Sequence, residues 1–315
     1  MVDRPNKPSA LASTPGLPPQ PQVNISHANS RVSAVLPTGE SIEVLLFGAT
    51  VISWKDRAGN EKLWVSDAAK LDGSKAVRGG IPLVFPVFGT APNHAQTSKL
   101  PQHGFARNSK WEFLGKSSSE STPSTSQSDA SVKLDFGLSS ATLDDKTKEL
   151  WPYTFSAIYT VTLTPDGLRT GIVINNDGDK PFECQFLCHT YLRINDITKV
   201  EVTGLENSEY IDKVDGAKTK SQSGAVTITG ETDRVYTSKP TIVVTEGGST
   251  AFKIERDNLD NVVVWNPWTE KAAGMGDFEP KDGFKNMICV EAGSVTGWTT
   301  LEAGDAYEGA QTISY

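Results

Sequence analysis

Two residues near the ends of apolar segments have side chains suited to proton transfer: His189 in FECQFLCHTYL and Glu291 in MICVEAG. An imidazole and a carboxylate have ordinary pKa values of about 6.5 and about 4.3, so both can exchange protons near neutral pH when their surroundings help. Each residue type also has a more common interpretation. A lone histidine is often half-buried in a sheet, and a carboxylate often emerges at a strand end.

Strand parity separates His189 from the cysteines that precede it. Alternate side chains of a strand point to opposite faces, so Cys184 and Cys188 are predicted on the core face and His189 on the other. A zinc site built from these two thiols and His189 is therefore disfavoured, and no metal is predicted. His189 shares its face with Gln185 and Tyr191, a composition found in sugar-binding clefts and in ordinary half-solvated sheets.

Three further segments carry polar candidates for ligand binding. KAVRGGIPLVFPVFG contains Arg78, LPQHGFARNSKWEF contains Gln102, His103 and Arg107, and GETDRVY contains Asp233. The glycines beside Arg78 would let the backbone approach a ligand closely, and two arginines can form a fork for phosphate oxygens. The alternatives are a Gly-Pro turn with surface arginines, and a structural salt bridge for the aspartate.

Short alternating runs closed by turn residues dominate the chain. Thr164-Pro165-Asp166-Gly167 predicts a hairpin turn, and helical periodicity is clear only in ATLDDKTKELW, where Asp144 and Asp145 would lie near the N-terminus of the helix. The predicted fold class is all-β, as one large antiparallel β-sandwich over residues 23–315 with few short helices. A Pro-rich disordered tail is expected over residues 1–22, and a Ser-rich surface loop over residues 115–131.

Composition narrows the possible partners. The 315 residues are 37% hydrophobic and carry a net charge of −8, which disfavours nucleic acid and anionic membranes as the principal partner. Neither a secretory signal nor a membrane anchor is expected from the polar N-terminal stretch. Three cysteines in a chain of this length do not form a disulfide framework, so a reducing, cytoplasmic location is predicted.

Six segments occur in an order that resembles the aldose 1-epimerase, or mutarotase, superfamily, and in particular its hexose-6-phosphate branch. They are RGGIPLVFP, LPQHGFAR, CHTYL, GETDRVY, VVVWNPW and MICVEAG. The resemblance covers nearly the whole chain after the tail. It implies a galactose-mutarotase-like supersandwich and interconversion of the α and β anomers of a hexose 6-phosphate, with D-glucose 6-phosphate expected. It implies His189 and Glu291 as the catalytic pair, with substrate contacts from Arg78, Gln102, Arg107, Asp233 and, as a secondary candidate, His103.

The implied chemistry suits these residue types. An ionised Glu291 would take the proton of the C1 hydroxyl while a protonated His189 gives one to the ring oxygen O5. A negative charge near the imidazolium is expected to raise the pKa of His189 and favour this state. No cofactor, metal or covalent intermediate is required, and a small-molecule sugar phosphate is the expected partner. The sequence sets no oligomeric state.

Three alternatives remain open. The protein could be a mutarotase for unphosphorylated aldohexoses, or a carbohydrate-binding β-sandwich without catalysis, which would need no matched acid and base. A glycosidase needs two carboxylates beside the bond and ranks last. Trp265 and Trp268 could stack on a sugar ring or fill the sandwich.

Overall fold

The computed structural model describes residues 20–118 and 130–315, which form three antiparallel sheets. The four-stranded sheet has the order β1-β2-β3-β4, with bounds Gln22–Ser26, Arg31–Val35, Ser41–Leu45 and Thr50–Lys55. The eight-stranded sheet has the order β14-β13-β16-β19-β20-β10-β5, and β11 also pairs with β20. In that order, and with β11 last, its bounds are Lys218–Ser221, Glu209–Asp212, Thr232–Thr237, Asn261–Asn266, Met287–Leu301, Phe182–Cys188, Leu83–Val84 and Tyr191–Arg193.

The nine-stranded sheet has the order β15-β12-β17-β18-β21-β9-β8-β7-β6. Its bounds, in that order, are Val226–Thr227, Val200–Thr203, Ile242–Glu246, Ser249–Asp257, Ala306–Ser314, Gly167–Asn176, Phe155–Thr164, Val132–Ser139 and Glu112–Ser118. The helices are α1 (Asp145–Leu150) and α2 (Trp268–Gly274), and short 3₁₀ turns span Ala106–Asn108, Ser140–Thr142, Ile197–Lys199 and Gly283–Asn286. The predicted all-β class is confirmed.

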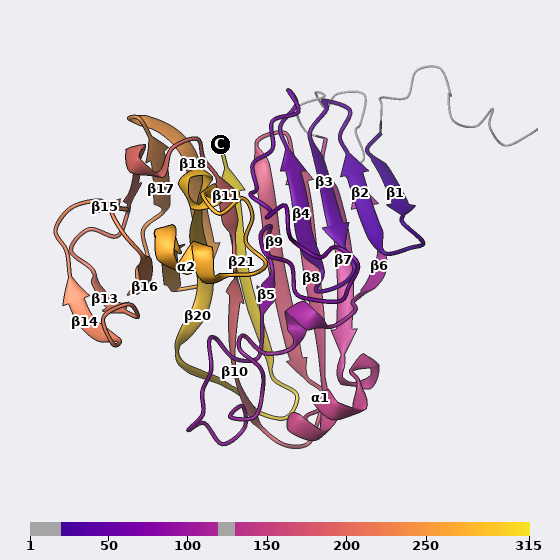
Figure 1. Cartoon of the computed structure of the whole chain (residues 1–315). Coiled ribbons are helices and arrows are strands. Elements are labelled where there is room, and N and C mark those ends of the chain that lie inside the picture. Colours follow the sequence, from indigo (N-terminus) through magenta and orange to yellow (C-terminus); the bar gives the residue numbers. More distant parts are fainter. Residues whose placement is uncertain (1–19, 119–129) are drawn as a thin grey trace, which may run out of the picture.

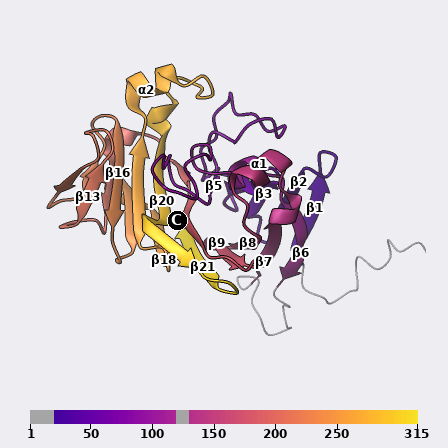
Figure 2. The same cartoon turned by 90° about the horizontal axis from the view of Figure 1, so that it is seen from below.

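One hydrophobic core joins the three sheets. Trp54 on β4, Tyr159 on β8 and Val264 on β19 are all fully buried members of the same cluster. Figures 1 and 2 show β1 to β4 on one side of the molecule beside β6 to β8, with β13 and β16 on the opposite side. A smaller cluster, which includes Tyr191 and Trp265, covers the other face of the eight-stranded sheet. This second face carries the candidate site.

Local sequence signals account for most boundaries. The hairpin predicted at residues 164–167 joins β8 to β9, with Thr164 paired to Gly167. Helix α1 begins where it was predicted, because the Asp144 side chain accepts a hydrogen bond from the Thr147 backbone N–H at 2.9 Å. Helix α2, which has seven residues, was not predicted.

Two predicted segments differ from the structure or lie outside it. The expected loop over residues 115–131 is shorter at its start, because Gly115 to Ser118 continue β6 and pair with β7. Residues 119–129, and residues 1–19 of the predicted tail, lie outside the described residues, and β1 begins at Gln22. Within the described part of the chain, no helix combines the length and apolar character needed to cross a membrane.

Gly293 allows β10 and β20 to approach closely beside the site. A Cβ at this position would lie 2.7 Å from the Leu187 Cβ and 2.7 Å from the Phe186 carbonyl oxygen. Gly293→Ala is therefore expected to lower the free energy of unfolding by about 1–3 kcal/mol, the usual cost of overpacking. Urea unfolding followed by circular dichroism measures this change.

Gly171→Ala is the matched control, because its Cβ would find its nearest neighbour, the Ala310 Cβ, at an ordinary 3.7 Å. This variant is expected to unfold near the wild-type midpoint. Equal stability of the two variants would show that the contact between β10 and β20 is not tight at Gly293.

Candidate functional site

Strand register places His189 opposite Glu291. Leu187 pairs with Gly293 and Cys188 with Ala292 on one side of the histidine, and Tyr191 pairs with Cys289 on the other. The same register continues through residue 189, so His189 and Glu291 are cross-strand neighbours on one face. The histidine Nδ1 lies 3.4 Å from the Glu291 Oε1. The two side chains that the sequence singled out therefore meet.

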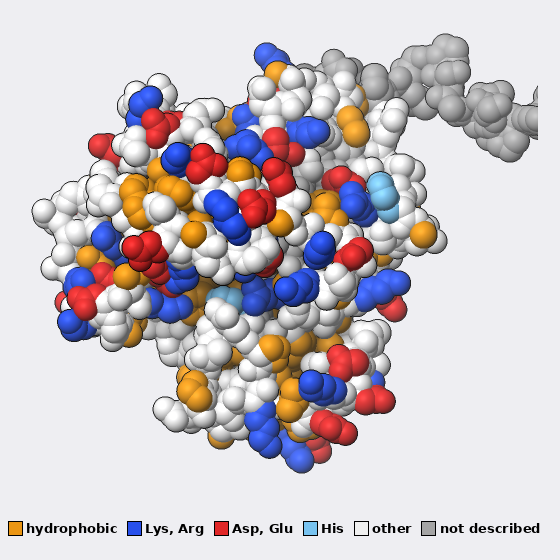
Figure 3. Space-filling model, in the orientation of Figure 1, with side chains coloured by type: hydrophobic (Ala, Val, Ile, Leu, Met, Phe, Trp, Pro, Cys, Tyr) orange, Lys and Arg blue, Asp and Glu red, His pale blue; other side chains and the backbone are white. Residues whose placement is uncertain are grey.

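The neighbouring strands extend this face into a pocket. Glu291 pairs with Val263 on β19, and Trp265, which pairs with Cys289, pairs in turn with Asp233 on β16. The pocket has a volume of about 240 Å³, and its lining residues are Arg78, Phe88, Gln102, His103, His189, Lys213, Asp233, Val263, Trp265, Lys271, Met275 and Glu291. In Figure 3 a histidine surface is visible among basic side chains near the middle of the molecular face.

Three rings surround the His189 imidazole. Tyr191 stacks on it with ring centroids 4.7 Å apart and planes 10° apart, while Trp265 and His103 approach it edge-on at 5.9 and 5.8 Å. The Nδ1 of His189 and the Oε2 of Glu291 are buried and have no hydrogen-bond partner among the described residues. The rings thus fix the plane of the imidazole without occupying its nitrogen atoms.

Burial favours the neutral form of both members of the pair. The pKa of Glu291 is raised well above its usual value by burial and by nearby Asp233. The pKa of His189 is lowered well below its usual value by burial and then by the positive charges around it, including Arg107. The expectation that the histidine pKa would be raised is therefore wrong, because burial and the neighbouring basic groups lower it.

The pair nevertheless holds one transferable proton, whether both groups are neutral or both are charged. A protonated Glu291 beside a neutral His189, and an ionised Glu291 beside a charged His189, have the same number of protons and the same net charge. A proton that crosses the 3.4 Å between Nδ1 and Oε1 converts one form into the other. Such a pair can donate one proton and accept another at two points of a bound molecule.

Arg78 is held by a bidentate ion pair. Its Nε and Nη2 donate to the two carboxylate oxygens of Asp277 at 3.2 Å each, and its Nη1 donates to the Tyr191 hydroxyl at 3.2 Å. The sequence had suggested that the glycines after Arg78 let the backbone approach a ligand. In the structure Gly79 instead allows a close approach between two segments of the chain. A Cβ on Gly79 would lie 2.4 Å from the Val65 Cα, so the close approach is to the backbone of Val65, with which Gly79 forms an isolated β-bridge.

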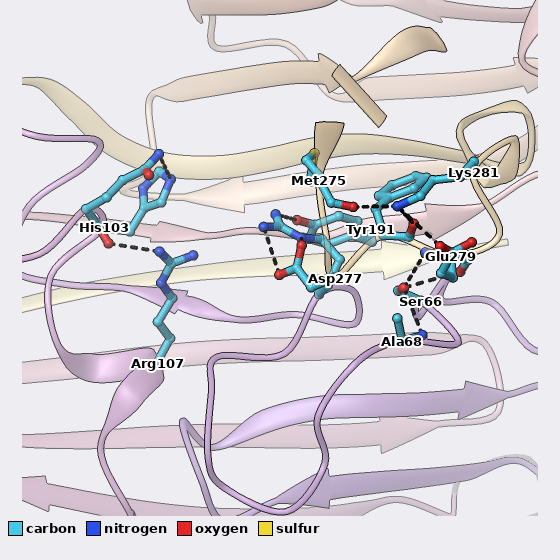
Figure 4. A network of polar contacts seen from close by, with 12 residues as sticks. Ser66, Ala68, His103, Arg107, Tyr191, Met275, Asp277, Glu279 and Lys281 are labelled. Carbon is cyan, nitrogen blue, oxygen red and sulfur yellow. Dashed lines mark hydrogen bonds and ion pairs between the residues drawn. The ribbon is translucent and has the colours of Figure 1, made fainter. Parts of the chain in front are cut away.

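A clamped loop positions Asp277. Lys281 Nζ donates to the carbonyl oxygens of Met275 and Phe278 at 2.7 and 3.0 Å, and the Ser66 hydroxyl accepts the Glu279 N–H at 2.8 Å. Figure 4 shows this network beside Tyr191 and Asp277, with Arg107 and His103 across from them. The loop joins α2 to the 3₁₀ turn at Gly283–Asn286, between the segments VVVWNPW and MICVEAG and outside both.

Arg107 lies close to the pocket without a carboxylate partner among the described residues. Its Nη2 donates to the Gln102 carbonyl oxygen at 2.8 Å, and its buried Nε has no hydrogen-bond partner in the described chain. Burial, together with the charge of Arg78, lowers the pKa of Arg107, although Tyr191 acts in the opposite direction. An anion in the pocket would relieve this cost.

His103 presents an N–H to the pocket. Its Nδ1 accepts the Gly89 backbone N–H at 3.1 Å, which leaves the ring proton on Nε2. Burial and the charge of Arg107 lower the pKa of His103 to about 2, so the ring is neutral at physiological pH. The Gln102 side-chain amide lies 3.4 Å from this Nε2.

Asp233 faces Lys213 across the pocket, with 3.8 Å between Nζ and Oδ2. Burial raises the pKa of Asp233, although Lys213 counteracts it. The ammonium of Lys213 also lies 4.4 Å from the ring centroid of Phe88. The structure thus places every candidate residue except Arg107 in the pocket lining, and Arg107 lies beside it through its contact with Gln102. It separates the two tryptophans: Trp265 lines the pocket, whereas Trp268 packs on Phe284.

Sequence reasoning missed three contributors to the site, namely Tyr191 as a support for His189, Lys213 and Asp277. Tyr191 shares the parity of His189 and was within reach of that argument. Lys213 and Asp277 lie in segments whose local sequence contains no motif that indicates a binding site.

The cysteines divide between the two faces of the sheet. Cys184 and Cys188 are buried in the main core, as parity predicted, but Cys289 lies on the site face two residues before Glu291. Ligand atoms of His189, Cys289 and Glu291 all lie within 4.8 Å of one another. If a metal ion bound at this face, these three residues would hold it.

Comparisons with known proteins agree on one family. Residues 32–314 match the family described as aldose 1-epimerase. A relative from Cenchrus ciliaris, named "Putative glucose-6-phosphate 1-epimerase", is 34% identical over 86% of this chain and 80% of its own. A protein of the same name from Escherichia coli is 34% identical over 78% of this chain and 77% of its own.

Solved structures agree with this match. A crystal structure from Salmonella typhimurium, described as a "putative mutarotase", superposes with a TM-score of 0.78. It shares 28% identity and covers 95% of this chain and 96% of its own. A galactose 1-epimerase from Lactobacillus acidophilus shares the fold at 13% identity, with a TM-score of 0.67 and coverage of 95% and 98%.

The protonation states of the two pocket histidines can be measured in the substrate-free protein. Because their pKa values are lowered, His189 and His103 are expected to give the ¹⁵N shifts of neutral rings at about pH 5, below the ordinary histidine pKa of about 6.5. In the unfolded chain the two histidines bind protons at their ordinary pKa of about 6.5. Their contribution to folding stability is therefore fully present above about pH 6.5 and is lost progressively as the pH falls below it. A charged His189 ring at pH 5 would contradict the burial argument.

Proposed function

Since the chain belongs to the aldose 1-epimerase family, we propose that it interconverts the α and β anomers of a hexose 6-phosphate, with D-glucose 6-phosphate as its substrate. The protein is an epimerase, and the finer assignment of substrate and residues is our own. The observation that carries it is the buried His189–Glu291 pair, which lines a pocket close to Arg107, an arginine without a carboxylate partner among the described residues.

Ring opening requires one proton to leave the C1 hydroxyl and another to reach the ring oxygen O5. In our proposal Glu291 takes the first and His189 gives the second, which yields the open aldehyde. Rotation about the C1–C2 bond and reversal of both transfers close the ring on the other face. Each side chain recovers its starting state, and each positioned group supplies about 100- to 10,000-fold of rate.

The productive form of the pair is the charge-separated one. The substrate-free pocket favours the neutral form, so substrate must shift the balance. Sugar hydroxyls that donate to Glu291 replace the water that burial removed, and this stabilises its carboxylate. The proton for His189 then comes from within the pair and not from solvent, which keeps the reaction independent of proton exchange with water.

The sugar 6-phosphate binds at the basic side of the pocket. Arg107 is the strongest candidate contact, because Arg78 and Lys213 already face Asp277 and Asp233. A guanidinium suits phosphate because its N–H groups match two oxygens at once. Arg78 retains further N–H groups and adds a second contact.

The remaining polar side chains bind the sugar ring. Asp233 accepts a hydrogen bond from a sugar hydroxyl, and the Nε2–H of His103 donates to a sugar oxygen. Gln102 lies beside His103 and contributes its side-chain amide. Trp265, at the pocket wall, offers a face or an edge against the apolar side of the ring.

His189→Asn and Glu291→Gln are each expected to lower kcat for glucose 6-phosphate anomerisation by about 100- to 10,000-fold, because each removes one proton-transfer group. Polarimetry on freshly dissolved α anomer measures the rate, and thermal unfolding checks that the fold persists. His94→Asn is the matched control, since His94 pairs with Glu183 outside the pocket. Normal rates in both site variants would leave a carbohydrate-binding protein as the better account.

Arg107→Met tests the phosphate assignment. It is expected to lower kcat/KM for glucose 6-phosphate by about 10- to 100-fold, since hydrogen bonds to charged groups contribute about 1.5–3 kcal/mol. The rate on free glucose should change little. Exposed Arg169→Met is the control, with unchanged rates on both sugars. A wild-type enzyme that acts equally well on free glucose or galactose would instead support a mutarotase for unphosphorylated hexoses.

A further inference from the structure

Cys289 adds a thiol to the proposed catalytic pair. It precedes Glu291 by two residues on β20, and it pairs with Tyr191 on β11 and with Trp265 on β19, the two residues whose rings flank His189. Its Sγ, a histidine nitrogen and a Glu291 oxygen all lie within 4.8 Å of one another. Proton transfer in the proposed reaction makes no use of this thiol.

Two of the three residues offer buried atoms with no other partner. His189 Nδ1 and Glu291 Oε2 have no hydrogen-bond partner within the described residues, and at least nine-tenths of each side chain is buried. An unsatisfied buried polar atom costs about 1–3 kcal/mol. A ligand that accepts electron pairs from both atoms would remove that cost, and a metal ion does so.

The donor set selects the class of metal. A thiolate, an imidazole and a carboxylate suit Zn²⁺ far better than Mg²⁺ or Ca²⁺, which prefer oxygen ligands. Ligand atoms around a tetrahedral Zn²⁺ lie about 3.3–3.7 Å apart, given bond lengths of about 2.0–2.3 Å. Side-chain rotations that move the ligand atoms by about 1 Å would therefore bring all three within bonding distance of one ion.

The surrounding charges permit a cation here. Arg78 is neutralised by Asp277 at 3.2 Å, and Lys213 faces Asp233 at 3.8 Å. Lys271, a further lining residue, pairs with Glu231 at 2.8 Å, and Arg107 lies near the pocket without a carboxylate partner among the described residues. Ionisation of Cys289 and Glu291 would supply two negative charges at the metal itself.

We propose that His189, Cys289 and Glu291 form a binding site for Zn²⁺, and that its occupation inhibits the enzyme. Binding forms Zn–N, Zn–S and Zn–O bonds and releases two protons, one from the thiol and one from the His189–Glu291 pair, with no change of oxidation state. The ion then holds the groups that transfer protons to the sugar and blocks its access. The inhibition rests on the proposed function, whereas the metal site does not.

Cobalt spectroscopy tests the site without any assay of activity. Co²⁺ added to the full chain after dialysis against chelator should give a near-ultraviolet thiolate-to-cobalt charge-transfer band. The band is expected to persist in Cys184→Ala, a matched loss of a buried thiol from the opposite face, and to vanish in Cys289→Ala. Cys289→Ser serves the same purpose if the alanine variant does not fold. Absence of the band in the wild type, or its persistence in a folded Cys289 variant, overturns the site.

Kinetics test the inhibition. Zn²⁺ should inhibit the wild type and Cys184→Ala in competition with substrate, and chelator should restore the rate, while Mg²⁺ has no effect. In the Cys289 variants the inhibition constant, measured against the basal rate of each variant, should rise more than about tenfold, since even outer changes at metal sites weaken binding by that factor. Equal inhibition of all variants refutes the proposal. If the wild type lacks epimerase activity, the proposed function fails while the cobalt band still decides the site.

Discussion

The pairing of β10 and β11 with β20 is the constraint on which the site depends. Its register sets His189 across from Glu291 and Tyr191 across from Cys289, so the proposed acid, the proposed base and the ring that stacks on His189 share one face. A slip by one residue would turn His189 into the core and Cys188 into the pocket. The sandwich core behind the sheet and the close approach at Gly293 stabilise this register, and they thereby keep His189 next to Glu291.

Burial determines the electrostatics of the pair. Burial lowers the pKa of His189 and raises that of Glu291, which favours their uncharged forms, although together they still hold the one transferable proton that the proposed reaction needs. Arg78 is neutralised by a clamped loop, while Arg107 has no carboxylate partner in the described chain. In the proposed function an anionic sugar supplies the missing negative charge at Arg107, which would link the choice of substrate to the protonation state of the pair.

The sequence predicted the all-β fold and the segregation of Cys184 and Cys188 from His189, because both follow from strand alternation. Ordered motifs pointed to Glu291, but its contact with His189 depends on a register between strands about a hundred residues apart, which no local pattern contains. Lys213 and Asp277 reach the site from segments without a motif. The direction of the histidine pKa shift was wrong, because the extent of desolvation is a property of the folded core and not of residue types.

The central claim is that the buried pair opens and recloses the ring of a hexose 6-phosphate. Two-dimensional exchange NMR of equilibrated glucose 6-phosphate with a catalytic amount of protein in D₂O tests it most directly. The account predicts exchange cross-peaks between the α and β H1 signals well above the uncatalysed rate, with the C1 hydrogen retained because only oxygen-bound protons move. Exchange no faster than in the protein-free solution, or loss of the H1 signal to deuterium, would contradict it.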